Sequence, residues 1–200
     1  MISKSHASSI RGCYQALGVR RFYEERGGDY VNPHFATLVE VTPGILSEIL
    51  LPRLYEIAAN GGMLDLCCGS GEMTVIFRSW LEEVNSTIEM DISAADPFTC
   101  EAYKRSTGKM AETWSFEDVC DGVLDDLGLS FGLVCISYAV HLLEPSRNSA
   151  FFQNLSRHSR LMLIVSPTKN KGIVDESLGW RQAEYRTVQR IHFRLYETLV

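Results

Sequence analysis

The stretch that decides the fold is Met63-Leu64-Asp65-Leu66-Cys67-Cys68-Gly69-Ser70-Gly71-Glu72-Met73-Thr74. Residues 63–67 have the pattern of a short strand, and small residues follow it. A helical pattern of apolar residues then begins at Glu72 and continues to Leu81. A strand that enters a helix through a glycine loop brings backbone N–H groups close to a ligand, and a Cβ in such a turn would collide with it. The stretch therefore predicts a ligand-binding loop at the end of a strand.

The loop lacks one feature of a dinucleotide site. The motif G-x-G-x-x-G uses its third glycine to pack helix against strand, and Thr74 stands in that place. Asp65 comes just before the loop, where a carboxylate would repel a pyrophosphate and favour an ammonium or another cation. A nucleotide-dependent oxidoreductase is therefore disfavoured.

Residues 64–71, Leu-Asp-Leu-Cys-Cys-Gly-Ser-Gly, resemble the first motif of class I S-adenosylmethionine-dependent methyltransferases, an acidic residue followed by G-x-G-x-G. Cys67 departs from the motif because it replaces the first glycine, a place where cysteine fits if φ is negative. The resemblance extends from about Tyr23 to the C-terminus. It implies a methyltransferase (EC 2.1.1.-) with S-adenosyl-L-methionine as cofactor, a Rossmann-like fold and a seven-stranded sheet whose last strand is antiparallel.

The rest of the chain alternates short apolar strands with helical segments, which indicates a doubly wound, mostly parallel sheet. Strands are expected at 63–67, 88–95, 111–115, 133–137 and 161–166, and helices at 45–59 (kinked at Pro52), 72–83, 99–106, 120–127 and 146–158. The segments 185–188 and 191–195 are patterned as a closing hairpin, although no Asn-Gly turn joins them. We predict an α/β three-layer sandwich with a seven-stranded sheet and an antiparallel C-terminal strand, in a single domain over residues 1–200.

Composition narrows the class of protein. The 200 residues are 46% hydrophobic and carry a net charge of −6, which argues mildly against a dedicated nucleic-acid binder. The six cysteines show no C-x-x-C spacing, so we expect a reduced, cytoplasmic protein without a metal site. No apolar run reaches the ~18 residues of a membrane span. The first 23 residues are basic and contain no acid, which leaves a mitochondrial presequence as the alternative location.

Ligands of such sheets bind beyond the carboxyl ends of the strands, so the residues after each strand are the cofactor-binding candidates. The first loop contributes Asp65, Cys67, Cys68, Gly69, Ser70 and Gly71. After the second strand, a carboxylate would accept hydrogen bonds from both ribose hydroxyls. Asp91 has the spacing of about 20 residues typical of that role. Asp96, followed by Pro97 and Phe98, leaves a more ordinary length for the next helix and strand, and we favour it.

The resemblance adds two segments to the cofactor site. After the third strand, Ser115, Phe116 and Glu117 would lie beside the adenine. After the fourth strand, Ser137 and Tyr138 would approach the methionine end of the cofactor. Phe116 has the alternative role of a core residue, and Glu117 that of a helix cap.

His141 is the candidate catalytic base, because its ordinary pKa lies near neutrality, and Tyr138 is the second candidate. A histidine in an apolar helix start can instead be structural. The motif N/D-P-P-Y/F, which methyltransferases of base or glutamine amino groups carry after the fourth strand, is absent here.

The N-terminal residues 1–44 are expected to form an arm or lid. Residues 22–34 are rich in aromatic side chains, and Gly27 and Gly28 would give a lid its hinge. We place Tyr23 and Tyr30 over the ligand, the alternative being an ordinary surface turn with buried tyrosines.

The methyl acceptor is not named by any motif. We expect a small molecule, with RNA (a tRNA) as the alternative acceptor and a non-catalytic partner subunit as the alternative role. Lys169, Lys171 and Arg181 would make the rim of the pocket basic, which suits an anionic acceptor.

Overall fold

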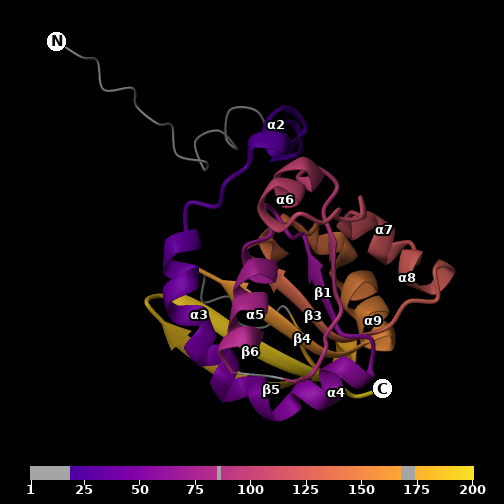
Figure 1. Cartoon of the computed structure of the whole chain (residues 1–200). Coiled ribbons are helices and arrows are strands. Elements are labelled where there is room, and N and C mark those ends of the chain that lie inside the picture. The colour runs from indigo at the N-terminus through magenta and orange to yellow at the C-terminus, as the bar shows by residue number, and fades with distance from the viewer. Residues whose placement is uncertain (1–18, 85–86, 168–173) are drawn as a thin grey trace.

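A six-stranded sheet forms the centre of the molecule, in the order β2-β1-β3-β4-β6-β5 (Figure 1). The computed structural model describes residues 19–84, 87–167 and 174–200. The strands are β1 Met63–Leu66, β2 Ile92–Ala95, β3 Phe131–Ser137, β4 Ser159–Ser166, β5 Trp180–Val188 and β6 Ile191–Thr198. The strands β1 to β4 pair in parallel, whereas β6 runs antiparallel to β4 and β5. The predicted α/β sandwich with a mostly parallel sheet and an antiparallel C-terminal strand is confirmed.

Alternate residues of the central strands face two apolar clusters, as a pleated sheet requires. Met63 and Leu133 face the cluster that contains α3 Phe35–Ile49, α4 Leu54–Ala59 and α5 Glu72–Glu83. Leu64 and Val134 face the cluster that contains α7 Phe116–Cys120, α8 Val123–Asp126 and α9 Asn148–His158. The shorter elements are α2 Val19–Arg26, η1 Gly27–Asp29, η2 Leu51–Arg53, α6 Cys100–Thr107, η3 Val140–Leu142, η4 Pro145–Arg147 and η5 Glu176–Leu178. Both faces of the sheet are therefore covered, and its carboxyl edge is left for a site.

The strand predicted at 111–115, the third in chain order, is wrong, and the sheet formed by the described residues therefore has six strands rather than seven. In the described part of the chain this segment forms only an isolated bridge to the edge of β2, in which Asp96 N donates to Glu112 O at 2.9 Å. Ser115 then caps α7 in a reciprocal capping box with Asp118. Because the cap begins a helix at once, the extended segment is too short to form a ladder.

The predicted helix at 45–59 is two helices. α3 ends at Ile49, and Pro52 stands at the start of the short turn η2. A residue at the start of a helical turn does not need its N–H for a helical hydrogen bond, so proline is tolerated there. α3 also begins earlier than expected, at Phe35, and buries Leu38 completely. Residues 35–44 therefore belong to a helix that packs against the core, and the N-terminal arm ends before Phe35 rather than at residue 44.

The C-terminal hairpin is confirmed and is longer than its pattern suggested. β5 and β6 are joined by Gln189 and Arg190, whose φ values are 47° and 66°. Two positive φ values in a two-residue loop are the requirement of a type I′ turn, which Asn-Gly normally fills. The turn therefore forms without the Asn-Gly sequence that usually predicts it.

No described helix is by itself long and apolar enough to cross a membrane. The pair Phe35–Ile49 and Leu51–Ala59 meets the test of length and composition together, but the two helices are bent by 52°. Their apolar residues, among them Leu46 and Ile57, are buried in the core cluster, which accounts for the apolar composition of the two helices.

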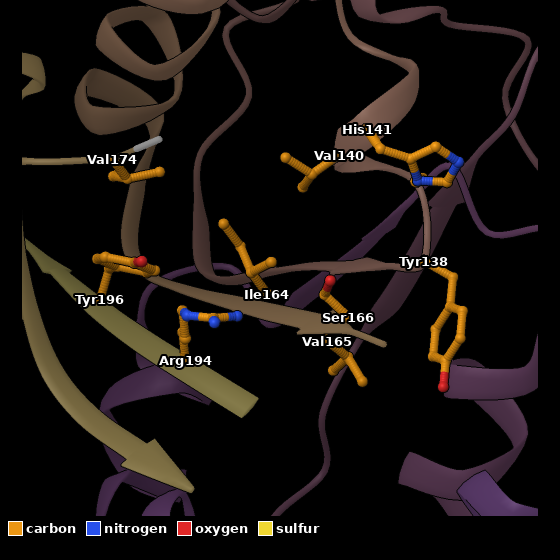
Figure 2. A pocket seen from close by; sticks show the side chains of 10 residues that line it. Tyr138, Val140, His141, Ile164, Val165, Ser166, Val174, Arg194 and Tyr196 are labelled. Atoms are coloured by element: carbon orange, nitrogen blue, oxygen red, sulfur yellow. The ribbon is translucent and has the colours of Figure 1, made fainter. Parts of the chain in front are cut away.

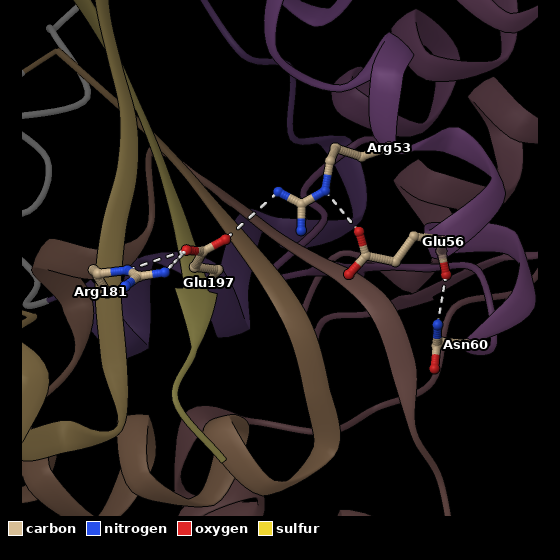
Figure 3. Close-up of polar contacts among 5 residues, drawn as sticks. All are labelled: Arg53, Glu56, Asn60, Arg181 and Glu197. Carbon is tan, nitrogen blue, oxygen red and sulfur yellow. Dashed lines mark hydrogen bonds and ion pairs between the residues drawn. The ribbon is translucent and has the colours of Figure 1, made fainter.

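A polar network fastens α4 to the hairpin (Figure 3). Arg53 lies 2.6 Å from Glu56 and 3.6 Å from Glu197, and Arg181 pairs with the other oxygen of Glu197. Asn60 Nδ2 donates to the backbone oxygen of Glu56 at 2.7 Å. Glu197 lies opposite the start of β4, at the amino end of the parallel strands. Arg181 is thus at the far end of the sheet from the glycine loop, and its predicted place on the pocket rim is wrong.

Candidate active site

The glycine loop turns tightly between β1 and α5. Gly71 N donates to Cys68 O at 2.8 Å, and Cys67, Gly69 and Gly71 have φ values of 56°, 57° and 87°. A Cβ on Gly71 would lie 2.7 Å from Thr107 Cγ2, so this glycine is needed for space as well as for its φ. Cys67 does not have the negative φ that would suit a cysteine. It adopts the left-handed conformation of the glycine that it replaces.

Asp65 is buried under the loop, with 1% of its surface exposed. Its Oδ2 accepts from Thr74 N at 3.0 Å and from Thr74 Oγ1 at 2.7 Å, and Tyr103 OH donates to Thr74 Oγ1 at 3.3 Å. The pKa of Asp65 is raised to about 7, mainly by burial and to a smaller extent by the nearby charges of Glu72 and Asp96, although the hydrogen bonds from Thr74 act to lower it. Thr74, at the place of a third glycine, therefore anchors this carboxylate to the start of α5.

The structure separates the two ribose candidates. Asp96 ends β2 beside the glycine loop, where its Oδ2 accepts from Gly69 N at 3.3 Å. Its Oδ1 accepts from Phe98 N at 2.9 Å and Thr99 N at 3.0 Å, which fixes the turn into α6. Asp91 is exposed and lies before β2, where its carbonyl accepts from the first residue of β1, at the amino end of the sheet. Only Asp96 is brought to the loop.

Three buried carboxylates converge on the loop, and one of them, Glu72, was not among the predicted site residues. Its Oε1 accepts from Ser70 Oγ and, at 3.3 Å, from Asn32 N of the N-terminal arm. Burial raises the pKa of Glu72. Glu72 follows Gly71 directly, so its place in the motif was a signal for it. Together with Asp65 and Asp96, it makes this end of the sheet negative.

The N-terminal arm lies on the glycine loop. The Tyr23 ring stacks on Phe98 with centroids 6.1 Å apart and lies 5.7 Å from the Tyr30 ring. A Cβ on Gly69 would lie 3.0 Å from the Tyr30 ring, and one on Gly27 would lie 2.4 Å from Phe98 O. Tyr23, Tyr30, Phe98 and the glycine loop are therefore brought together, with the half-buried Pro97 between Asp96 and Phe98.

The adenine candidates after the bridge at Glu112 are only partly consistent with that role. Phe116 is 7% exposed and packs edge-on against Phe151, with centroids 5.0 Å apart, which makes it a core residue. Ser115 is engaged with Asp118 in the cap of α7. Glu117 is exposed on the first turn of α7. Phe116 as an adenine-stacking side chain is thus a wrong prediction, because its ring points into the core.

At the carboxyl end of β3, Ser137 has a buried hydroxyl without a hydrogen-bond partner in the described part of the chain. Tyr138 follows with φ 56°, and its ring stacks on His34 of the arm at 5.1 Å. Desolvation raises the pKa of Tyr138 and lowers that of His141, which lies in η3. Tyr138 and His141 line one pocket together, although His141 itself is exposed to solvent.

This pocket lies between β4, β6 and the segment after β3 (Figure 2). Its lining consists of Tyr138, Ala139, Val140, His141, Ile164, Val165, Ser166, Val174, Arg194 and Tyr196. Arg194 and Tyr196 of β6 were not among the predicted site residues, because the segment 191–195 was predicted only as part of a closing hairpin. Lys169 and Lys171, expected on the rim, lie outside the described residues. Among residues 19–84, 87–167 and 174–200, no three His, Cys, Asp or Glu side chains lie close enough together to hold a metal ion.

Comparison with known proteins agrees with this geometry. No protein-family model matches the sequence. An uncharacterised protein of Schizosaccharomyces pombe is 28% identical in an alignment that covers 95% of this chain and 92% of that protein. An O-methyltransferase family protein from Burkholderia thailandensis has a TM-score of 0.60 at 12% identity, over 96% of this chain. The chain spans only 63% of the length of that bacterial protein.

Two further solved structures match at a TM-score of 0.54. They are the magnesium protoporphyrin IX methyltransferase of Synechocystis with bound S-adenosyl-L-homocysteine, at 14% identity, and human N-acetylserotonin methyltransferase in complex with S-adenosylmethionine, at 13% identity. They are matched over 90% and 96% of this chain and over 96% and 68% of their own lengths, respectively. The chain has the class I methyltransferase fold. In this methyltransferase fold, the glycine loop, Asp96 and the Tyr138 segment occupy the carboxyl edge of the sheet, where α/β proteins bind their ligands.

Proposed function

We propose that the protein is an S-adenosylmethionine-dependent methyltransferase that transfers a methyl group to a small molecule. The observation that carries the proposal is the negative glycine loop, around which Asp65, Glu72 and Asp96 are all buried. Such a loop repels the pyrophosphate of a dinucleotide but suits a cofactor with an ammonium and a sulfonium group. The fold shared with methyltransferases that bind this cofactor supports the same conclusion.

The residues at the site fit this cofactor. Asp96 would accept hydrogen bonds from the ribose hydroxyls, and the left-handed loop leaves its backbone open to close approach. Tyr23, Tyr30 and Phe98 would cover the bound molecule. The unpartnered hydroxyl of Ser137 supports a polar ligand group at the end of β3.

When bound, S-adenosylmethionine supplies an electrophilic methyl group whose transfer leaves S-adenosylhomocysteine. The chain's residues would orient the acceptor and exclude water. His141 is suited to accept the acceptor's proton, because desolvation lowers its pKa and keeps the imidazole neutral near pH 7. Tyr138 keeps its proton, since its pKa is raised, and would donate a hydrogen bond to the acceptor.

RNA as acceptor and a non-catalytic partner subunit are the alternatives. The pocket beside Tyr138 is lined mainly by apolar and aromatic side chains, which favours a small molecule over a phosphate backbone. A pocket that holds two proton-transfer candidates favours an enzyme over a partner subunit. The five described cysteines are free, which supports the cytoplasm as the proposed compartment.

Calorimetric titration with S-adenosylmethionine and, separately, with NADH tests the proposal. We expect micromolar binding of the sulfonium cofactor alone, and Asp96→Asn should weaken it by about tenfold or more because a charge-assisted pair of bonds is lost. Asp91→Asn is the matched control and should leave the affinity unchanged. Absence of S-adenosylmethionine binding in the unmodified protein would refute the proposal that this chain alone is an S-adenosylmethionine-dependent enzyme.

A further inference from the structure

Arg194 carries a buried charge that the chain does not neutralise. Only 6% of its surface is exposed, and its guanidinium lies over the Tyr185 ring, 5.2 Å from the centroid. It forms no ion pair with any described carboxylate. The residues outside the described ranges, 1–18, 85–86 and 168–173, contain no Asp or Glu. No side-chain carboxylate of this chain therefore pairs with Arg194.

Seven other arginines of the chain behave differently. Each of the following is paired with at least one carboxylate: Arg21, Arg53, Arg105, Arg147, Arg157, Arg181 and Arg186. All of these arginines are more exposed than Arg194. These seven arginine charges, which water already solvates, are neutralised by carboxylates. Arg78 and Arg194 have no carboxylate partner among the described residues, and Arg194 is the more deeply buried of the two.

Burying an unpaired charge costs several kcal/mol unless a partner of opposite sign is provided. The cation–π contact with Tyr185 offsets only part of this cost. An anionic ligand would supply the remaining compensation. Because a guanidinium presents parallel N–H donors, a carboxylate is the anion that matches it in two bonds at once.

The surroundings of Arg194 indicate the chemistry of the rest of that ligand. Figure 2 shows the Arg194 side chain in the pocket wall between Tyr196 and Ser166, with Tyr138 and His141 at the other end. Apolar side chains, Val140, Ile164 and Val174 among them, line the space between. We infer that the methyl acceptor is a small acid with an apolar body, whose carboxylate binds Arg194 while its far end faces His141 and Tyr138. The identification of this acid as the methyl acceptor rests on the proposed function, whereas its carboxylate is inferred from Arg194.

The carboxylate of the cofactor is the competing partner for Arg194. In the strand order, two strands, β3 and β4, separate β6 from β1 and its glycine loop. Arg194 lies opposite Ile164 of β4. This position favours the acceptor over the cofactor.

The test uses benzoate as the probe and benzamide as its neutral analogue, both titrated into the full chain by NMR. We expect benzoate to bind at least about tenfold more tightly than benzamide. Arg194→Met should remove this preference and leave the affinity for S-adenosylhomocysteine, measured by calorimetry, within about twofold. Arg160→Met, which removes an exposed arginine at the start of β4, is the matched control and should change neither affinity.

Three results would overturn the inference. They are equal binding of benzoate and benzamide to the unmodified protein, benzoate binding that survives Arg194→Met, and a parallel loss of S-adenosylhomocysteine affinity in that variant, which would assign Arg194 to the cofactor. The first comparison needs no variant, so it holds even where Arg194→Met fails to fold. Arg194-dependent benzoate binding without any cofactor binding would instead retain the carboxylate site and refute the methyl transfer.

Discussion

Cys67 holds the glycine loop in a conformation that its own side chain opposes. A φ of 56° costs an L-residue with a Cβ about 1–2 kcal/mol relative to glycine. The half-buried side chain packs against the α9 side of the sheet, and burial raises the pKa of its thiol, so it does not act as a thiolate. The loop therefore keeps the shape of its motif at a local energetic cost.

This cost can be measured by substitution. Cys67→Gly should be more stable than Cys67→Ala by about 1 kcal/mol, because both variants lose the sulfur and only alanine keeps the strained Cβ. Urea denaturation gives the difference. At the neighbouring Cys68, whose φ is not positive, the same pair of variants should rank in the opposite order. Equal stability of the two Cys67 variants would show that the position carries no strain.

Asp65 gives the protein a pH dependence. Its pKa is about 7 in the folded state and near 3.9 in an unfolded chain, so the folded state binds the extra proton between those values. The contribution to stability is therefore fully present below pH 4 and is lost as the pH rises to about 7. The free energy of unfolding should fall over this window relative to Asp65→Asn, which keeps the acceptor for Thr74. A difference between the two proteins that is flat from pH 4 to pH 7 would contradict the burial of the charge.

Among the elements, the hairpin turn is the one whose residues fit its geometry least. Gln189 and Arg190 both have positive φ, and neither is glycine or asparagine. The turn persists because β5 and β6 pair along their whole lengths and β6 is fixed against β4. Tertiary pairing here overrides the local preference of the turn residues.

Arg190→Gly should stabilise the protein by about 0.5–1 kcal/mol, since glycine adopts φ of 66° without strain. Gln189 is retained because its amide donates to Glu40 at 2.9 Å. Thermal denaturation followed by circular dichroism would report the gain. The same change at Arg160, inside β4, should lower the melting temperature, and a loss at both positions would mean that the turn is not strained.

At the scale of the whole molecule, the sheet collects residues from distant parts of the chain at one edge. Asp96 reaches Gly69, Asn32 reaches Glu72 and His34 reaches Tyr138, across separations that no local pattern records. The alternation of strands and helices predicted this edge as the site. The same alternation could not predict which side chains point into the site at this edge, because their direction depends on how the crossovers between the strands are arranged.

The sequence by itself determined the strand-loop-helix motif, the parallel sheet with its antiparallel end, and Asp96 as the favoured acid over Asp91. These features depend on periodicity, spacing and the conformational limits of small residues, which are properties of neighbours in the chain. Only the tertiary structure decided that the segment at 111–115 is no strand, that Phe116 faces the core and that Arg181 lies at the far end of the sheet. It also placed Arg194 in the pocket beside Tyr138. Burial and pairing of charges arise from contacts between distant segments, so they exist only once the chain has folded.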